Sequence, residues 1–119
     1  MGDYRSLRVW QTAKQLVVLV YRVTDALPGS ERHGLTAQLR RAAISVPANV
    51  AEGAGRGSDR ELRRFVAIAW GSAQEVICEL ELAVALGFLR HAEVSESIAC
   101  ARRVAGELTR LREALEGES

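Results

Sequence analysis

The chain contains few aromatic residues, cysteines and prolines, and each shortage limits the fold classes and kinds of site that the sequence can form. Aromatic residues make up 5% of the 119 residues, and there are two prolines and two cysteines. The cysteines, Cys78 and Cys100, show no CxxC or histidine-paired spacing, so we interpret them as buried or semi-buried thiols. Alanine, leucine, valine, glutamate and arginine are abundant instead, a composition that favours helices over sheet.

A strong net charge and a long apolar run are also missing. The formal charge of +1 argues against a protein whose whole surface attracts nucleic acid. No apolar run approaches the length needed to span a bilayer, and the polar N-terminus does not resemble a signal peptide. Together with two lone thiols, these features predict a cytoplasmic protein with no membrane partner.

Apolar residues recur at three- and four-residue spacing in four segments, at about residues 6–26, 31–53, 58–86 and 92–115. The predicted core stripes include Leu16, Leu39, Val66 and Leu108. Four amphipathic helices with short connections predict an all-α, antiparallel up-and-down four-helix bundle. We expect one such domain over residues 1–119.

Proline, glycine and serine residues predict where these helices begin, bend and end. Pro47 lies inside the second segment, whose apolar register continues past it, so we expect one kinked helix there. Gly53, Gly55 and Gly57 are interpreted as the exit from that helix into a flexible loop. Ser58 precedes Glu61 by three residues, which is the capping-box spacing for the start of the third helix.

The second and third segments carry small and apolar residues on more than one side. On a helical wheel, residues away from the core stripes align along both helices: Ile44, Ala48, Ala51, Ala67, Gly71, Cys78 and Leu82. A lone bundle buries one stripe per helix, so the second stripe predicts an interface between copies of the chain. The alternative is an alanine-rich face in contact with solvent.

Arginine is concentrated in the middle of the chain, where six candidates for phosphate binding occur: Arg40, Arg41, Arg56, Arg60, Arg63 and Arg64. Three acidic residues accompany them, whereas residues 65–101 contain one arginine and five glutamates. This asymmetry indicates either a basic and an acidic end of one bundle or two solvated faces. The arginines either contact nucleic acid or pair with glutamates such as Glu52 and Glu61.

Aromatic side chains are not interleaved with these arginines in the sequence, whereas proteins that bind single-stranded nucleic acid combine basic and stacking aromatic side chains. We interpret four aromatic side chains as packing residues: Tyr4, Trp10, Tyr21 and Trp70. Of these, Trp10 and Trp70 are expected to cover either helix seams or a joint between subunits.

No arrangement of residues indicates catalysis, a metal or a cofactor. The glycine-rich stretch 53–58 follows a helix rather than a strand and lacks the lysine of a P-loop. His33 and His91 are isolated, and the cluster Glu75, Glu79 and Glu81 lacks the histidine of a carboxylate metal site. We therefore expect no catalytic residues, no metal ligands and no cofactor.

Four stretches resemble one protein family: YRSLRVWQTAKQL, LPGSERHGLTAQLRRAAISVPANVAEGAGRGSDRE, FVAIAWGSAQEV and ELAVALGFL. They are similar to the four-helix bundle proteins encoded in intervening sequences of bacterial large-subunit ribosomal RNA genes. The resemblance implies a cytosolic bacterial protein that forms a ring-like homopentamer and has no established enzymatic activity. Relatives include the accessory variability protein of diversity-generating retroelements, which engages a reverse transcriptase and binds nucleic acid through a basic surface.

The resemblance and the residues together predict a non-enzymatic homo-oligomer, a pentamer by resemblance, that binds RNA or DNA through its arginines. The alternative is a structural or adaptor oligomer that holds a protein partner, a role suited to the acidic region between residues 65 and 101.

Overall fold

Four long helices follow one another along the chain in the computed structural model, which describes residues 3–117. Helix α1 spans Arg8–Thr24, α2 spans Leu35–Gly55, α3 spans Asp59–Ala85 and α4 spans His91–Gly117. Two short 3-10 turns, η1 at Tyr4–Ser6 and η2 at Gly29–Glu31, precede α1 and α2. Residues 1, 2, 118 and 119, which the expected domain includes, lie outside the described residues.

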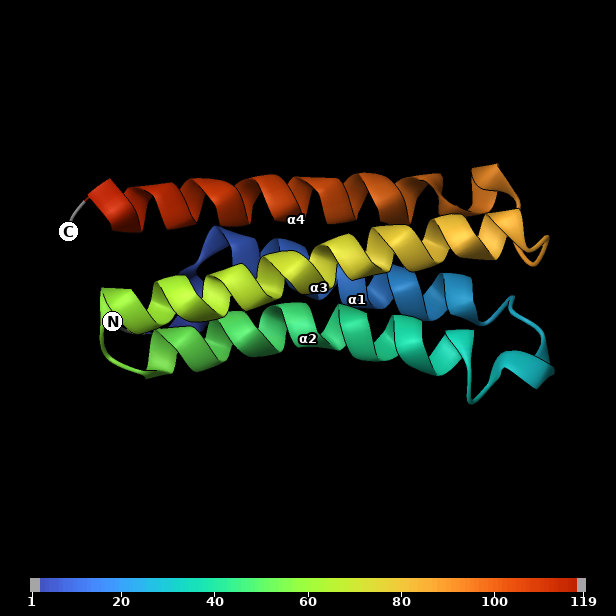
Figure 1. Cartoon of the computed structure of the whole chain (residues 1–119), viewed down its shortest axis with the longest axis horizontal. Coiled ribbons are helices and arrows are strands. Elements are labelled where there is room, and N and C mark those ends of the chain that lie inside the picture. The colour runs from blue at the N-terminus through green and yellow to red at the C-terminus, as the bar shows by residue number, and fades with distance from the viewer. Residues whose placement is uncertain (1–2, 118–119) are drawn as a thin grey trace.

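Each helix runs antiparallel to the one before it, and each packs on its neighbours in sequence, with α1 also packing on α4 (Figure 1). The predicted all-α four-helix bundle is therefore confirmed. One end of the bundle, called here the α2–α3 end, holds η1, the α2–α3 connection and the last turn of α4 (Figure 1). The opposite end holds the α1–α2 and α3–α4 connections.

The core forms where the four apolar stripes meet, as the spacing predicts. Leu16, Leu39, Val66 and Leu108 are fully buried, one from each helix, within a single hydrophobic cluster that runs through the bundle. Burying a leucine or valine side chain contributes about 1.5–3 kcal/mol, so these stripes dominate the stability of the fold.

Helix α3 begins and ends at the predicted residues. The Ser58 hydroxyl accepts a hydrogen bond from the Glu61 backbone N–H at 3.2 Å, which satisfies one of the free donors at the start of the helix. After the last turn, Gly87 adopts a φ of +82°, and the Phe88 N–H bonds the Ala83 carbonyl at 3.0 Å. This is a Schellman ending, which favours glycine because a Cβ is strained at positive φ.

Helix α2 departs from the prediction at its C-terminal end. It is one helix through Pro47, but it continues to Gly55, so Gly53 lies inside it rather than in an exit loop. Gly53 is buried, and a Cβ at this position would lie 2.8 Å from the Phe65 Cβ on α3. The glycine therefore allows α2 and α3 to approach closely. The bend expected at Pro47 stays a prediction.

Candidate nucleic-acid interface

The fold separates the six predicted arginines into two groups. Arg40 and Arg41 lie in the first turns of α2, whereas Arg56, Arg60, Arg63 and Arg64 lie at the α2–α3 end. Fifteen residues of helix separate Arg41 from Arg56, which is about 22 Å at 1.5 Å per residue. The six arginines therefore do not form one binding surface.

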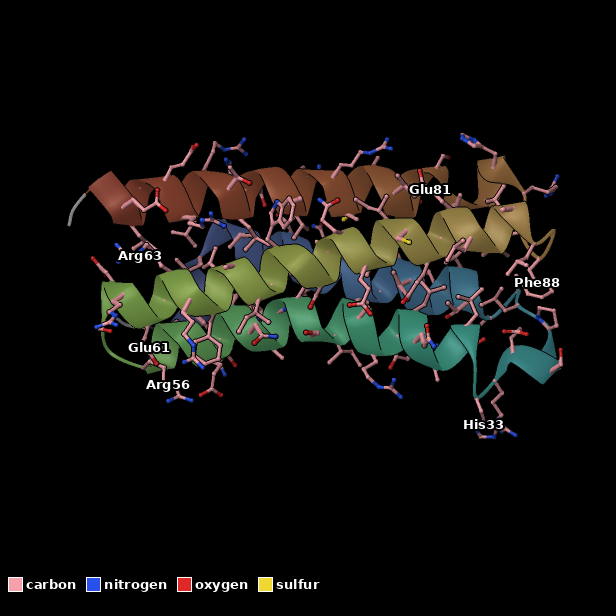
Figure 2. The ribbon with its side chains drawn as sticks, viewed as in Figure 1. His33, Arg56, Glu61, Arg63, Glu81 and Phe88 are labelled. Carbon is pink, nitrogen blue, oxygen red and sulfur yellow. The ribbon has the colours of Figure 1, made fainter. Side chains whose placement is uncertain are left out.

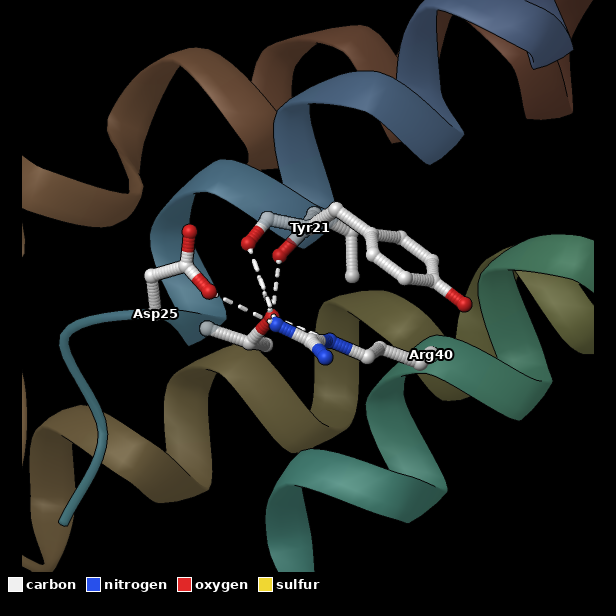
Figure 3. Close-up of polar contacts among 5 residues, drawn as sticks. Tyr21, Asp25 and Arg40 are labelled. Atoms are coloured by element: carbon white, nitrogen blue, oxygen red, sulfur yellow. Dashed lines mark hydrogen bonds and ion pairs between the residues drawn. The ribbon is translucent and has the colours of Figure 1, made fainter. Parts of the chain in front are cut away.

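Arg40 is engaged in contacts between α1 and α2 (Figure 3). Its Nε donates to the Thr24 Oγ1 at 2.9 Å, and its Nη2 donates to the Asp25 Oδ1 at 3.0 Å and to the Tyr21 carbonyl at 3.4 Å. The guanidinium also lies over the Tyr21 ring, 4.4 Å from the centroid. These contacts use most of its donors, so the structure gives Arg40 a role in tying α1 to α2.

Arg41 lies on the other side of α2, beside two carboxylates of α3. It lines a hollow of about 440 Å³ between α2 and α3 together with Gln38, Ser45, Ser72 and Glu75. The Ser45 hydroxyl on α2 and the Ser72 hydroxyl on α3 form a hydrogen bond of 2.8 Å within this hollow. Ser45 thereby links two helices through its side chain.

Glu79 follows Glu75 by one turn of α3, and its side chain is only 7% exposed. Its Oε1 has no hydrogen-bond partner among the described residues. The pKa of Glu79 is raised from 4.5 to about 7, chiefly by burial and in second place by the nearby Glu75 carboxylate, while Arg41 opposes the shift. Phosphate binding is disfavoured around Arg41, because two acidic side chains compete for the same guanidinium.

At the α2–α3 end, two arginines flank one buried ring. The Arg56 and Arg64 guanidinium groups lie 5.2 and 4.9 Å from the centroid of Phe65. Arg56 pairs with Glu52 at 2.9 Å, and Arg64 pairs with Glu61 at 3.3 Å. Both ion pairs are exposed, and Figure 2 shows Arg56 and Glu61 at this end of the bundle.

The same end contains an open pocket of about 630 Å³ between the start of α3 and the end of α4. It is lined by the following residues: Ser58, Arg60, Glu61, Arg63, Arg64, Arg112 and Glu116. Arg63 lies on the α4 side of α3, where its Nη1 donates to the Leu115 carbonyl at 3.3 Å (Figure 2). Four arginines therefore surround one hollow.

Arg112 was missed by sequence reasoning, since it lies 48 positions after Arg64. Nothing in the local sequence around Arg112 places it beside the start of α3. Only the antiparallel return of α4 brings the two segments together.

Trp70 lies at the seam between α3 and α4, one of the two positions expected for it, and is only partly packed there. Its side chain is 40% exposed and lines a hollow of about 400 Å³ between α3 and α4. Arg112 and Glu116 line this hollow as well as the arginine pocket, so the two adjoin. Trp10, in contrast, packs half-buried against the core and makes an edge contact with Tyr4 at 5.0 Å.

The residues predicted to join copies lie on the outside of the bundle. Ile44, Ala48, Ala67, Gly71 and Leu82 are exposed, and Ala51 is half-buried. Cys78 is also exposed, which corrects its interpretation as a buried or semi-buried thiol. It lies on the outward side of α3, away from the core stripe.

Cys100 is buried as expected, with its thiol donating to the Thr12 carbonyl at 3.8 Å. Burial raises the pKa of this thiol, which keeps it in the unreactive protonated form. Within residues 3–117, no group of three or more histidine, cysteine, aspartate or glutamate side chains is placed to hold a metal ion. Likewise, none of the helices described is long and apolar enough to cross a membrane.

Comparison with known proteins assigns the chain to a family. No curated protein matches it. The sequence model of the 23S rRNA-intervening sequence protein matches residues 5–110, which include all but the last seven residues of the four-helix bundle. The chain therefore belongs to the 23S rRNA-intervening sequence protein family.

Proposed function

We propose that this chain is a non-enzymatic, homo-oligomeric four-helix bundle of the cytoplasm that binds nucleic acid through its α2–α3 end. The observation that carries the proposal is the open pocket in which Arg60, Arg63, Arg64 and Arg112 meet. A guanidinium presents a planar fork of donors that matches phosphate oxygens, so several forks around one hollow favour a polyanion.

Two arginines at this end, Arg64 and Arg112, are held in ion pairs that a phosphate can replace. Arg64–Glu61 and Arg112–Glu116 are exposed pairs of 3.3 and 3.7 Å. Exposed ion pairs contribute about 0–1 kcal/mol, so an arriving phosphate exchanges with the carboxylate at small cost. Arg40 lies outside this proposed surface because its contacts are internal, and Arg41 because it lies next to Glu75 and Glu79.

Self-assembly is supported by the distribution of exposed apolar side chains. Seven large ones are exposed in the described chain: Val18, Tyr21, Ile44, Ile68, Trp70, Leu82 and Leu86. Six of them lie on α1, α2 or α3, and the seventh, Leu86, directly follows α3. None of them lies on α4. Scattered exposed apolar residues are ordinary, but their absence from α4 favours an assembly that covers α1, α2 and the outward side of α3 and leaves α4 and the α3–α4 seam with Trp70 in solvent.

Nucleic-acid binding is tested by removing two arginines of the pocket. We expect the R60Q/R112Q variant to bind RNA and DNA more weakly than the unmodified chain. The slope of log affinity against log salt should fall by about 1.4, since each single-strand phosphate contact contributes about 0.7. R22Q/R102Q is the control, because it removes the same charge at exposed sites outside the pocket. Equal weakening by both variants, or no binding at low salt, would refute the proposal.

Assembly is tested by placing a charge on the outward side of α2. Ile44 is 44% exposed, so Ile44→Glu disturbs the isolated bundle little but places a carboxylate in any interface that covers it. We expect light scattering to show a lower mass for this variant, and for Leu82→Glu, than for the unmodified chain. Ala99→Glu, on the exposed side of α4, should keep the full mass. The resemblance implies five copies, and a dilute, stable single subunit would contradict assembly.

A second candidate function, a structural or adaptor oligomer that holds a protein partner, rests on a different surface. Val18, Tyr21 and Ile44 meet on the α1–α2 side around a shallow hollow of about 500 Å³. Exposed apolar groups around a hollow suit a protein side chain better than a phosphate. A defined partner retained after nuclease treatment, and lost in Ile44→Glu, would favour this function.

A further inference from the structure

Trp70 lies on the same side of α3 as an arginine of the proposed nucleic-acid surface. It follows Arg63 by seven residues, which is two helical turns, so both side chains face α4. Val66 lies between them on the same side and, with Trp70, lines the hollow of about 400 Å³. The fold therefore places an exposed indole on the same side of α3 as Arg63, and the return of α4 brings Arg112, which is distant in sequence, to the same seam.

The two hollows adjoin along the seam between α3 and α4, and we name them together the Trp–Arg groove. It begins at Ser58 and Arg60, and it ends at Trp70 and Thr109. Ten residues of α3 separate Arg60 from Trp70, which is about 15 Å. At about 3.4 Å per stacked nucleotide, this length accommodates about four nucleotides of one strand. In a duplex the base faces are stacked on one another, so none is free to stack on a side chain.

Charge is unevenly distributed along the Trp–Arg groove. Arg60, Arg63 and Arg64 lie at its α2–α3 end, whereas Glu113 lines only the hollow that contains Trp70. Arg112, paired with Glu116 at 3.7 Å, borders both hollows. Phosphates are therefore favoured at the arginine end, and an uncharged base face is favoured over the indole.

We propose that the Trp–Arg groove binds single-stranded nucleic acid, with a base stacked on Trp70 and the adjoining phosphates on Arg60, Arg63 and Arg112. This inference rests on the proposed nucleic-acid function and specifies the form of the ligand. Every base has a π-face, so stacking on an indole is tolerant of sequence, and the arginines contact the backbone that all strands share. The groove therefore selects single strands over duplexes and has little preference between DNA and RNA.

The fluorescence of Trp70 provides the test. In a Trp10→Phe variant, Trp70 is the only indole, because the chain has two tryptophans. We expect a short oligothymidine and a short oligouridine each to quench this emission as they bind. A duplex of matched phosphate number should quench little, and inorganic polyphosphate should bind the arginines without quenching.

Affinity supplies the second measurement. We expect Trp70→Ala to weaken oligonucleotide binding roughly 5- to 150-fold, the range seen when one stacking side chain is removed. Trp70→Phe should retain most of the affinity, because it keeps an aromatic face. Leu86→Ala is the matched control, since Leu86 is a 62% exposed apolar residue at the opposite end of the bundle.

The outcomes separate this inference from the function on which it rests. Oligonucleotide binding that depends on Arg60 and Arg112, with no quenching and full affinity in Trp70→Ala, would overturn stacking and leave nucleic-acid binding standing. Equal quenching by duplex would overturn the preference for single strands. Emission that shifts with protein concentration, and not with oligonucleotide, would show that a second copy covers Trp70. Absence of any binding would overturn both proposals.

Discussion

Replacing Glu79 by glutamine should stabilise the bundle above neutral pH and have little effect in acid. The Glu79 side chain is 7% exposed, and its Oε1 has no hydrogen-bond partner among the described residues. The charged groups that bear on it are Glu75 on the same helix and Arg41 on α2. Burial and Glu75 together outweigh Arg41 and raise the pKa of Glu79 from 4.5 to about 7.

The sign of the effect follows from proton binding. Because the folded chain holds this proton more tightly than the unfolded chain, the proton stabilises the fold most below about pH 4.5. Between about pH 4.5 and 7 the unfolded chain releases the proton first, so the free energy of unfolding falls as pH rises. A pKa difference of about 2.5, at about 1.4 kcal/mol per unit, sets the loss at roughly 3 kcal/mol above pH 7.

Urea denaturation at pH 4 and pH 8 measures this loss, at one protein concentration because assembly also contributes to stability. We expect Glu79→Gln and the unmodified chain to unfold at similar urea concentrations at pH 4. At pH 8 the variant should be more stable by up to about 3 kcal/mol, since it has no buried charge. Glu81→Gln, at an exposed site on the same helix, should change stability by less than about 0.5 kcal/mol. A variant no more stable than the unmodified chain at pH 8 would refute the reasoning.

Three other predictions concern the helix contacts and the thiols. Gly53→Ala should destabilise the bundle by about 1–3 kcal/mol in urea, because the new Cβ would lie 2.8 Å from the Phe65 Cβ; unchanged stability would contradict close packing there. Arg40→Leu should lower the free energy of unfolding by about 1–2 kcal/mol, because it removes the hydrogen bonds to Thr24 and Asp25, and it should leave RNA affinity unchanged. Thermal unfolding and a binding titration measure the two effects, and weakened binding would place Arg40 in the ligand surface. A thiol reagent should modify Cys78 in the folded chain, and Cys100 only after unfolding; mass spectrometry of the labelled peptides distinguishes them.

Local patterns in the sequence predicted the helices and their core stripes correctly. Leu16, Leu39, Val66 and Leu108 are buried as their spacing predicts, because a helix that folds into a bundle must bury its apolar stripe. Ser58 caps α3, and Gly87 allows its ending, since capping depends on groups within a few residues of one another. These features require no knowledge of which helix lies beside which.

The roles that local sequence patterns did not predict share one cause. Gly53 was assigned to a loop because glycines often end helices, but its contact with α3 makes it a packing residue. Cys78 was expected to be at least half-buried and is exposed. Trp70 lines a hollow together with Arg112, which lies 42 positions later in the sequence. In each case the side chain's role depends on its neighbours from another helix.

The composition and the spacing of the apolar residues by themselves determined that this chain forms a four-helix bundle. Helix formation and the apolar stripe of a helix depend on residues that lie within two helical turns of one another. The tertiary structure decided where each arginine lies and which groups surround it. Arg40 ties α1 to α2, Arg41 lies beside Glu75, and Arg112 joins Arg60 at the α2–α3 end. The physical reason is that hydrogen bonds and ion pairs form only at contact distances of about 3–4 Å and salt screens charges beyond about 10 Å, so the pairing and register of the helices set the partners of each guanidinium.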